Sequence, residues 1–187
     1  LDAGVVDAAQ GAGFQLWVKA DGSLWAQGSN TFGQLGIGGT SAVASPQKVA
    51  DDVARVFAGP SFTFFIKRNG SLWAMGRNTF GQLGIGSAVA FQTTPAQVDN
   101  AVSSVACGER HAIFLKSDGS VWTMGNNYYG QLGDGTTTQR NSPVRVSKAR
   151  TIPSLALAIP SFTIIAEMTR SPITAGGDVD AASMPSP

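Results

Sequence analysis

Two short motifs recur three times along this chain at almost constant spacing, and this periodicity restricts the fold more than any other feature. The tetrapeptide Gly-Ser-Leu/Val-Trp begins at Gly22, Gly70 and Gly119. The hexapeptide Gly-Gln-Leu-Gly-x-Gly begins at Gly33, Gly81 and Gly130, so both motifs repeat with offsets of 48 and 49 residues. Two motifs in one phase indicate an array of repeats, each a supersecondary unit that packs on its neighbours.

A turn signal separates two apolar segments in each repeat. The dipeptides are Asp21-Gly22, Asn69-Gly70 and Asp118-Gly119, which are typical of two-residue type I′ hairpins. That turn predicts three facing pairs on adjacent strands: Val18 with Trp25, Ile66 with Trp73, and Leu115 with Trp122. We therefore predict structural roles for Gly22, Trp25, Gly70, Trp73, Gly119 and Trp122.

Both faces of each predicted sheet are apolar. In the first repeat, alternation and the predicted turn place Phe14, Leu16, Val18 and Trp25 on one face, and Trp17, Leu24 and Ala26 on the other. A sheet that is apolar on both faces needs a neighbouring sheet on each side. Small sheets repeated every 40 to 50 residues or so are typical of a β-propeller. We predict an all-β fold, a partial β-propeller of three to four blades of four-stranded antiparallel sheets.

The repeat resembles the regulator of chromosome condensation repeat. The run Gly-Ser-Leu-Trp-Ala-x-Gly-x-Asn-x-x-Gly-Gln-Leu-Gly-x-Gly occupies residues 22–38 and 70–86, and also 119–135 with Val121 and Thr123 as variants. The resemblance covers roughly residues 5–168 and points to a bacterial member of the family or a fragment of one. It implies a propeller, usually of about seven blades, whose inter-strand loops bind partner proteins. Bacterial members often sit in large secreted proteins, so the resemblance favours a secreted or cell-surface location over a cytoplasmic one.

The repeats divide the chain into a propeller region, 1–170, and a tail. Complete repeats span 5–50, 51–99 and 100–148, and a half repeat spans 149–170. The Pro- and Ser-rich segment 171–187 is predicted to be a disordered tail or linker. A structural blade could combine halves of successive repeats, so that the half repeat completes the third blade and the strands around residues 5–19 lack the rest of a blade.

Three and a half repeats cannot close a seven-bladed ring. Either the chain is a piece of a longer array, which we favour because repeat arrays need caps or closure, or a homodimer covers the open blade faces.

Charge and hydropathy exclude several classes of partner. Lys and Arg total 13 against 12 Asp and Glu, a formal net charge of +1, so we expect no binding to nucleic acid by the chain itself. The longest apolar stretch, 152–168, is interrupted by Pro153 and Pro160, so we expect no membrane span. The single cysteine, Cys107, excludes an internal disulfide framework.

Catalytic and cofactor signals are weak. Cys107 and His111 could form a thiol–imidazole pair, but Phe14 and Phe62 occupy the position of His111 in other repeats, so we interpret both residues as structural. The Gly-rich loops lack the helix and Lys-Ser/Thr pair of a phosphate site. We expect no enzyme activity, no cofactor and no metal.

Asn30, Asn78 and Asn127 are predicted to hold the loops through side-chain to backbone hydrogen bonds.

Loop residues that differ between repeats are the best candidates for function, because the scaffold leaves them free to vary. Tyr and Arg are enriched at interface hot spots. The candidate partner-binding residues are Arg77, Asn126, Tyr128, Tyr129, Arg140 and Arg145. We predict a non-enzymatic scaffold, part of a larger protein, that binds a protein or an extracellular ligand. The alternatives are an extracellular or cell-surface adhesin or carbohydrate binder, and a chromatin-associated nucleotide exchange factor for a small GTPase.

Overall fold

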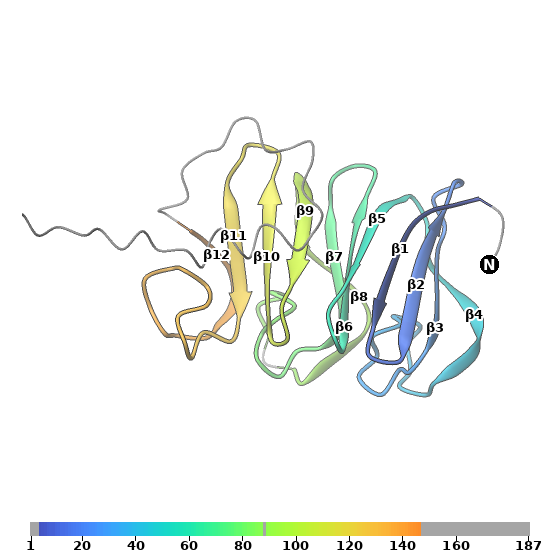
Figure 1. Ribbon diagram of the computed structural model, residues 1–187, viewed down its shortest axis with the longest axis horizontal. Helices are drawn as coiled ribbons and strands as arrows, with labels where there is room; N and C mark the ends of the chain where they lie inside the picture. Colours follow the sequence, from blue (N-terminus) through green and yellow to red (C-terminus); the bar gives the residue numbers. More distant parts are fainter. Residues whose placement is uncertain (1–3, 88, 147–187) are drawn as a thin grey trace, which may run out of the picture.

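The computed structural model describes residues 4–87 and 89–146, and these form three four-stranded antiparallel sheets that lie side by side (Figure 1). The first sheet, blade 1, contains β1 (Val5–Gly11), β2 (Phe14–Lys19), β3 (Leu24–Gly28) and β4 (Val43–Ala50). Blade 2 contains β5 (Val53–Ala58), β6 (Phe62–Lys67), β7 (Leu72–Arg77) and β8 (Phe91–Asp99). Blade 3 contains β9 (Val102–Cys107), β10 (His111–Lys116), β11 (Val121–Gly125) and β12 (Arg140–Arg145). The predicted all-β partial propeller is confirmed, with three blades in the described part of the chain.

Each blade takes its four strands from one sequence repeat. Strand order follows the chain in every sheet, and β5 contacts both β1 and β9 of the adjacent blades. The alternative in which a blade combines halves of successive repeats is therefore wrong. β12 completes blade 3, and β1 and β2 join β3 and β4 in blade 1. The half repeat 149–170 and the tail 171–187 lie outside the described residues.

The hairpin register differs by one residue from the prediction. Trp17 pairs with Trp25 and Val18 with Leu24, and the equivalent pairs Phe65–Trp73 and Phe114–Trp122 form in the other blades. The predicted facing pairs Val18–Trp25, Ile66–Trp73 and Leu115–Trp122 are wrong.

A three-residue loop causes the difference. The Gly22 N–H donates to the Lys19 carbonyl (2.8 Å), and the Lys19 N–H donates to the Ser23 carbonyl (2.9 Å). These bonds leave Ala20, Asp21 and Gly22 in the loop, and only Gly22 has a positive φ, +87°. A tight turn followed by a left-handed glycine is the usual three-residue hairpin, not a type I′ turn.

The new register moves each hairpin tryptophan to the opposite face. In blade 1 the face formed by Phe14, Leu16, Val18, Leu24 and Ala26 packs against blade 2. Trp25 lies on the other face with its pairing partner Trp17. Placing Trp25 beside Phe14, Leu16 and Val18 was therefore wrong, and so was placing Leu24 and Ala26 beside Trp17.

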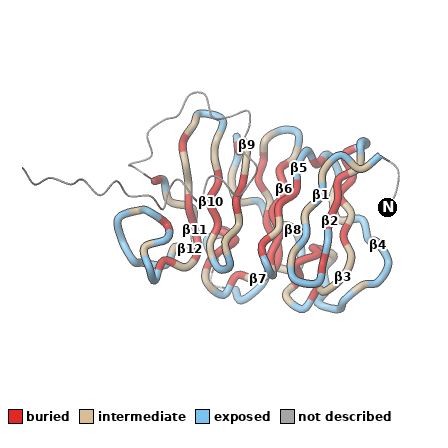
Figure 2. The backbone as a smooth tube through the Cα atoms, viewed as in Figure 1, coloured by how far each residue is buried: buried red, intermediate tan, exposed pale blue. Residues whose placement is uncertain are grey.

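Two hydrophobic cores lie between the three blades. One joins the blade 1 face to Phe65 and Met75 of blade 2. The other joins Phe62 and Phe64 of blade 2 to the blade 3 face that includes Phe114. The buried residues, red in Figure 2, accordingly lie on the strands at the two blade junctions. The expectation that neighbouring sheets cover both faces is confirmed for blade 2.

Polar contacts fix the spacing between blades. The carbonyl of Gly22 accepts a hydrogen bond from the Val53 N–H (2.9 Å), and that of Gly70 accepts one from the Val102 N–H (3.0 Å). The partly buried ion pair between Lys116 Nζ and Asp99 Oδ1 (2.7 Å) adds a second link between blades 2 and 3. The hairpin turns therefore join successive blades as well as strands. Over the described ranges the chain contains no helix that could cross a membrane.

Candidate interaction surface

One asparagine organises the loop that follows the third strand of each blade. Asn30 is fully buried, its Oδ1 accepts from the Leu35 N–H (2.9 Å), and its Nδ2 donates to the Gly39 carbonyl (2.8 Å). Asn78 and Asn127 make the same bond to Leu83 (3.1 Å) and Leu132 (3.0 Å). The prediction that these asparagines hold the loops is confirmed. Each of these side chains therefore links the two arms of its loop by hydrogen bonds.

The loop of one blade packs against the next blade. Thr63 of blade 2 donates its hydroxyl to the Gln34 carbonyl of the blade 1 loop (2.9 Å). A Cβ at Gly33 would lie 2.6 Å from the Thr93 Cα in β8, and one at Gly81 would lie 2.7 Å from the Asn141 Cα in β12. Glycine is needed here because the backbones of adjacent blades touch.

The blade 3 loop has no such cover among the described residues. A Cβ at Gly130 would meet only the Thr136 carbonyl of its own loop, 3.8 Å away. Gln34 and Gln82 are buried, whereas the equivalent Gln131 is exposed. The loop from Asn126 to Gln139, called here the terminal loop, therefore offers a surface that the earlier loops bury.

Two adjacent tyrosines dominate this surface. The exposed fractions of Tyr128 and Tyr129 are 73% and 86%, whereas Phe32 and Phe80, the equivalents of Tyr129, are half-buried. Their rings meet edge to face with centroids 4.8 Å apart. The Tyr129 N–H donates to Gln131 Oε1 (2.9 Å), and Gln131 Nε2 donates to Asn126 Oδ1 (2.7 Å). The aromatic pair therefore projects from a hydrogen-bonded base.

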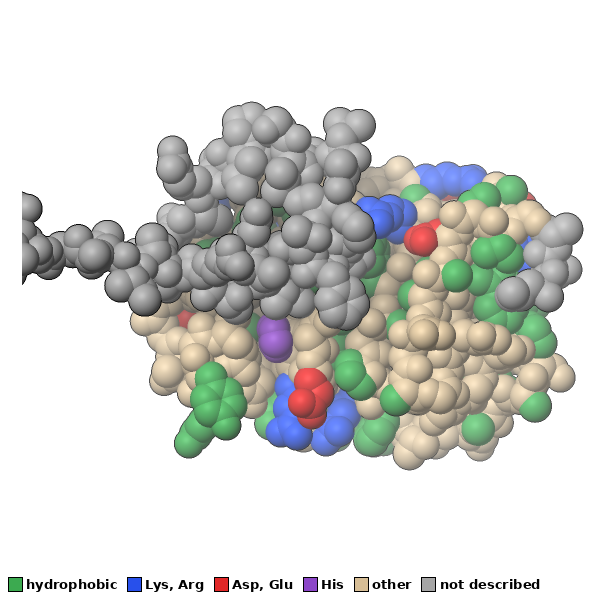
Figure 3. All heavy atoms as spheres, in the orientation of Figure 1, with side chains coloured by type: hydrophobic (Ala, Val, Ile, Leu, Met, Phe, Trp, Pro, Cys, Tyr) green, Lys and Arg blue, Asp and Glu red, His purple; other side chains and the backbone are tan. Residues whose placement is uncertain are grey.

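A shallow depression of about 580 Å³ lies beside the tyrosines. Its lining comes from the terminal loop and from the turn between β9 and β10; the residues are Glu109, Arg110, His111, Asn126, Tyr128, Tyr129 and Gln131. Figure 3 shows the chain's single histidine, in purple, above adjacent acidic and basic side chains near the lower edge of the molecule. The depression thus combines aromatic, neutral polar and oppositely charged groups.

Burial disfavours the thiolate and imidazolium that a Cys107–His111 nucleophile pair would need. Burial raises the pKa of the Cys107 thiol to about 12 and lowers the pKa of His111. A thiol with that pKa is protonated at neutral pH and is not a nucleophile. The His111 ring packs over Gly108, as Phe62 packs over Gly59 in blade 2. The geometry supports the structural interpretation of both residues.

The match to known repeats decides the family. The model of the regulator of chromosome condensation (RCC1) repeat matches residues 21–66, 69–115 and 118–156, and a second model of the same repeat matches 53–82 and 102–131. The chain belongs to the RCC1 repeat family. A comparison with curated proteins found no significant match.

Solved structures of RCC1 repeat propellers share this fold. Human WBSCR16 is 25% identical with a TM-score of 0.67 over 78% of this chain and 38% of its own. Prp20p from Saccharomyces cerevisiae is 21% identical with a TM-score of 0.70, over 78% of this chain and 39% of its own. Yeast RCC1 (Prp20) bound to Kap60 is 22% identical with a TM-score of 0.71, over 82% and 40%. This chain therefore spans about two fifths of the length of these propellers.

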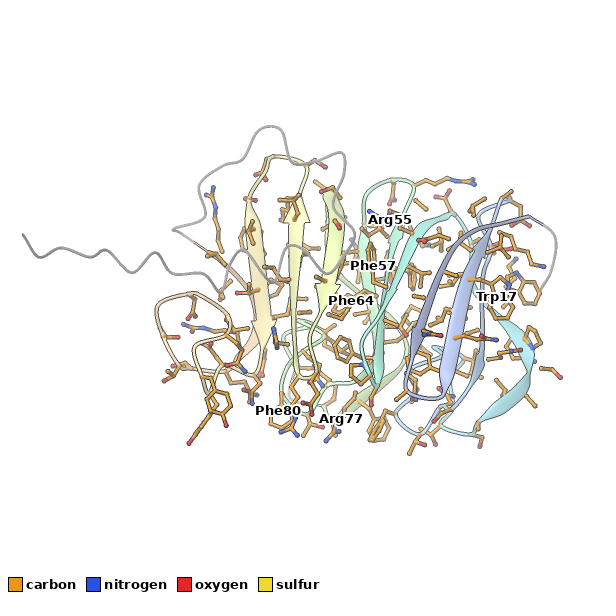
Figure 4. All side chains as sticks on the ribbon, in the orientation of Figure 1. Trp17, Arg55, Phe57, Phe64, Arg77 and Phe80 are labelled. Carbon is orange, nitrogen blue, oxygen red and sulfur yellow. The ribbon has the colours of Figure 1, made fainter. Side chains whose placement is uncertain are left out.

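The structure brings together three of the six residues predicted for partner binding. Asn126, Tyr128 and Tyr129 line the depression of this RCC1 repeat protein. Arg77, labelled in Figure 4, lies at the same end of blade 2. Its guanidinium covers the ring of Phe32, 5.1 Å from the centroid.

The other two predicted arginines lie elsewhere. Arg140 pairs with Gly125 at the terminal-loop end of the blade, and its Nη2 contacts Asp134 Oδ2 at 2.8 Å. Arg145 pairs with Trp122 toward the opposite end. The predicted set is therefore one cluster of three, with three arginines outside it.

An acid within the terminal loop explains the position of Arg140. The Asp134 side chain is 6% exposed. Burial alone would raise the pKa of Asp134, but hydrogen bonds from Thr136, Arg140 and Asn127 outweigh it and hold the pKa at about 2. Asp134 is thus ionised at neutral pH and ties the loop together. In the described part of the chain no group of three or more His, Cys, Asp or Glu side chains could hold a metal ion.

Sequence reasoning missed the groups contributed by the turn between β9 and β10. Glu109, Arg110 and His111 face the terminal loop because the Asn126 N–H donates to the Arg110 carbonyl (2.8 Å). One signal was present: Arg110 stands where the other repeats carry Gly13 and Ser61. The strand pairing that brings it to Asn126 became visible only in the structure.

Proposed function

We propose that this RCC1 repeat protein is a non-enzymatic protein-interaction scaffold whose binding surface is the terminal loop with the turn between β9 and β10. One observation carries the proposal: Tyr128 and Tyr129 are 73% and 86% exposed on a loop that internal hydrogen bonds hold rigid. Phe32 and Phe80, which occupy the position of Tyr129 in blades 1 and 2, are half-buried, and the position of Tyr128 is held there by exposed threonines.

A rigid aromatic pair is suited to protein binding. Tyrosine contributes a large contact area with few rotatable bonds, so little side-chain entropy is lost on association. Asn127 fixes the loop through bonds to Leu132 and to the carbonyls of Thr136 (2.9 Å) and Thr138 (3.1 Å). The cost of ordering the loop on binding is therefore already met in the free protein.

Relatives with the same fold bind proteins. The Prp20p structure is described with its binding properties to Gsp1p and histones, and another structure shows yeast RCC1 with bound Kap60. These partners belong to those proteins. They support the choice of a protein, rather than a small molecule, as the class of ligand for this chain.

Site-specific photo-crosslinking tests the proposal. A photoreactive benzophenone amino acid replaces Tyr128 in one variant, Thr79 in a second and Ser117 in a third. Thr79 is the exposed equivalent of Tyr128 in blade 2, and Ser117 is exposed on the β10–β11 hairpin. We expect a protein adduct of defined mass from position 128 in cells of the source organism, and none from the two controls. Equal adducts at all three positions, or none at 128, would contradict the proposal.

A further inference from the structure

An arginine of one blade covers an aromatic ring of the preceding blade at both described junctions. The Arg77 guanidinium carbon lies 5.1 Å from the centroid of Phe32, and that of Arg110 lies 5.0 Å from the centroid of Phe80. Figure 4 shows Arg77 and Phe80 at the same end of the blades. A guanidinium at this distance from a ring face is attracted to it electrostatically.

The two arginines come from different positions in the repeat but reach the same place. Arg77 ends β7, whereas Arg110 precedes β10. The Arg77 N–H donates to the Ser61 carbonyl (2.9 Å), and the Asn126 N–H donates to the Arg110 carbonyl (2.8 Å). Since Ser61 is the repeat equivalent of Arg110, and Asn126 that of Arg77, these two positions are hydrogen-bonded neighbours in every blade. Arginines from two different repeat positions thus make the same contact with the phenylalanine of the preceding blade. This recurrence indicates that the arginine–aromatic contact stabilises the junction between blades.

Tyr129 is the third aromatic in this series, and no cation covers its ring among the described residues. Its exposed fraction is 86%, and its ring meets that of Tyr128 edge to face. The half repeat carries Ser161 where blade 3 carries Arg110. Ser161 lies outside the described residues.

We infer that Tyr129 is a docking site for an arginine side chain of the protein partner, an inference that rests on the proposed function. Glu109 and Arg110 line the same depression as an ion pair, with Arg110 Nε 3.0 Å from Glu109 Oε1. Burial lowers the pKa of His111, which favours the uncharged imidazole in this depression.

The chain itself favours arginine over lysine at this end. Among the described residues, lysines lie over tryptophans: Lys19 over Trp25, Lys67 over Trp73 and Lys116 over Trp122. At this end of the blades arginines lie over phenylalanines, Arg77 over Phe32 and Arg110 over Phe80. The planar guanidinium can stack on a ring, which the compact ammonium cannot do. Tyr129, in the position of Phe32 and Phe80, is therefore matched to arginine.

The experiment uses a feature of the composition. The chain has two tyrosines, Tyr128 and Tyr129, so the full chain labelled with 3-fluorotyrosine gives two fluorine NMR signals, both from the site. Single Tyr→Leu variants assign the signals, and unchanged melting midpoints show that these exposed substitutions leave the fold intact. The probe is the blocked tripeptide Gly-Arg-Gly. Its controls are the same tripeptide with lysine and with citrulline, the neutral analogue of arginine.

We expect saturable shifts of the Tyr129 signal with the arginine peptide and none with citrulline. Tyr129→Leu should weaken peptide binding about 2- to 5-fold, read from the Tyr128 signal, which corresponds to the energy of an exposed cation–π contact. Equal shifts with citrulline or with lysine would overturn the inference, as would the absence of shifts at millimolar peptide. Shifts with a neutral disaccharide in place of the peptide would assign the surface to a carbohydrate instead.

The peptide titration and the crosslinking test distinguish failure of the arginine inference from failure of the proposed function. If position 128 yields a protein adduct but the arginine peptide does not bind, the scaffold function stands and the arginine inference fails. If the peptide binds but no protein adduct forms in cells, the docking site stands and the proposed function fails.

Discussion

The indole N–H of Trp73 donates a hydrogen bond to the hydroxyl oxygen of Ser71, 2.9 Å away. The Ser71 hydroxyl in turn donates to Asn69 Oδ1 (2.7 Å), so the bonds run from the sheet into the hairpin turn. The same pair, tryptophan and serine two residues apart, occurs in the other blades, at 2.8 Å for Trp25 and 2.9 Å for Trp122. The repeated Gly-Ser-Leu/Val-Trp motif is thus a device that locks the turn to its sheet.

Replacement of Ser71 by alanine should destabilise the protein. Ser71→Ala removes the acceptor of the Trp73 indole and the donor to Asn69, and Ser71 is 4% exposed. We expect the free energy of unfolding to fall by about 1–2 kcal/mol, measured by urea titration. Ser45→Ala at an exposed position of β4 is the control and should change it by less than about 0.5 kcal/mol. An equal effect of both substitutions would contradict the locking role.

The loop asparagine should be sensitive to chemically small changes. Asn78 is 2% exposed, and it accepts from the Leu83 N–H while its Nδ2 donates to the carbonyls of Ser87 and Val89. Asn78→Asp keeps the acceptor but sets a charge against two carbonyls, so we expect it to cost as much as Asn78→Ala, about 2–3 kcal/mol. Thermal unfolding measures both, with Asn100→Ala at an exposed position as the control. A near-native melting midpoint for Asn78→Asp would show that the amide donor is dispensable.

His111 should make stability depend on pH below its ordinary pKa. Burial lowers the pKa of His111 from 6.5, so below about pH 6.5 the unfolded chain binds the proton first. Stability is therefore present above that pH and is lost as the pH falls through the folded-state pKa. His111→Phe introduces the residue found at this position in blades 1 and 2 and should remove this loss. The stability difference between variant and wild type should grow from pH 7.5 to pH 5.5; a constant difference would contradict the assignment.

Asp134 should control the terminal loop in acid. Its pKa is held at about 2, below the ordinary value of 3.8, so its contribution is full above about pH 4 and is lost as the pH falls through 2. Asp134→Asn removes the charge-assisted bonds to Arg140 and should lower the free energy of unfolding by about 1–2 kcal/mol at pH 7. Between pH 4 and pH 2 the wild type should approach the variant. Hydrogen exchange at the Thr136 amide, which donates to Asp134 Oδ1 (2.9 Å), reports the same event locally.

Most of the fold follows from features that are local in sequence. The period of the motifs predicts the blades, and the two apolar faces predict their stacking. The hairpin register could not be predicted from the sequence, because Asp21-Gly22 fits both a two-residue turn and the last two residues of a three-residue loop. The backbone bond from Gly22 to Lys19 decides between them, and one residue of difference moves Trp25 to the other face.

The candidate site was predicted in part for a similar reason. Tyr128 and Tyr129 departed from Thr-Phe in the other repeats, so comparison of repeats identified them. Glu109 and His111 join them through strand pairing between β10 and β11, which places His111 opposite Gly125. Arg145 was grouped with them because it is basic and near in sequence, yet β12 carries it toward the opposite end of the blade.

The central claim is that an aromatic ring at this loop position binds an arginine from the adjoining structural unit. A double-mutant cycle on Arg110 and Phe80, whose guanidinium carbon and ring centroid are 5.0 Å apart, tests it most directly. The free energy of unfolding is measured in urea for the wild type, Arg110→Gln, Phe80→Leu and the double variant. We predict a favourable coupling of about 0.5–1 kcal/mol. A coupling of zero would mean that the Arg110–Phe80 contact does not contribute to the free energy of unfolding. It would then give no support for arginine binding at the exposed ring of Tyr129.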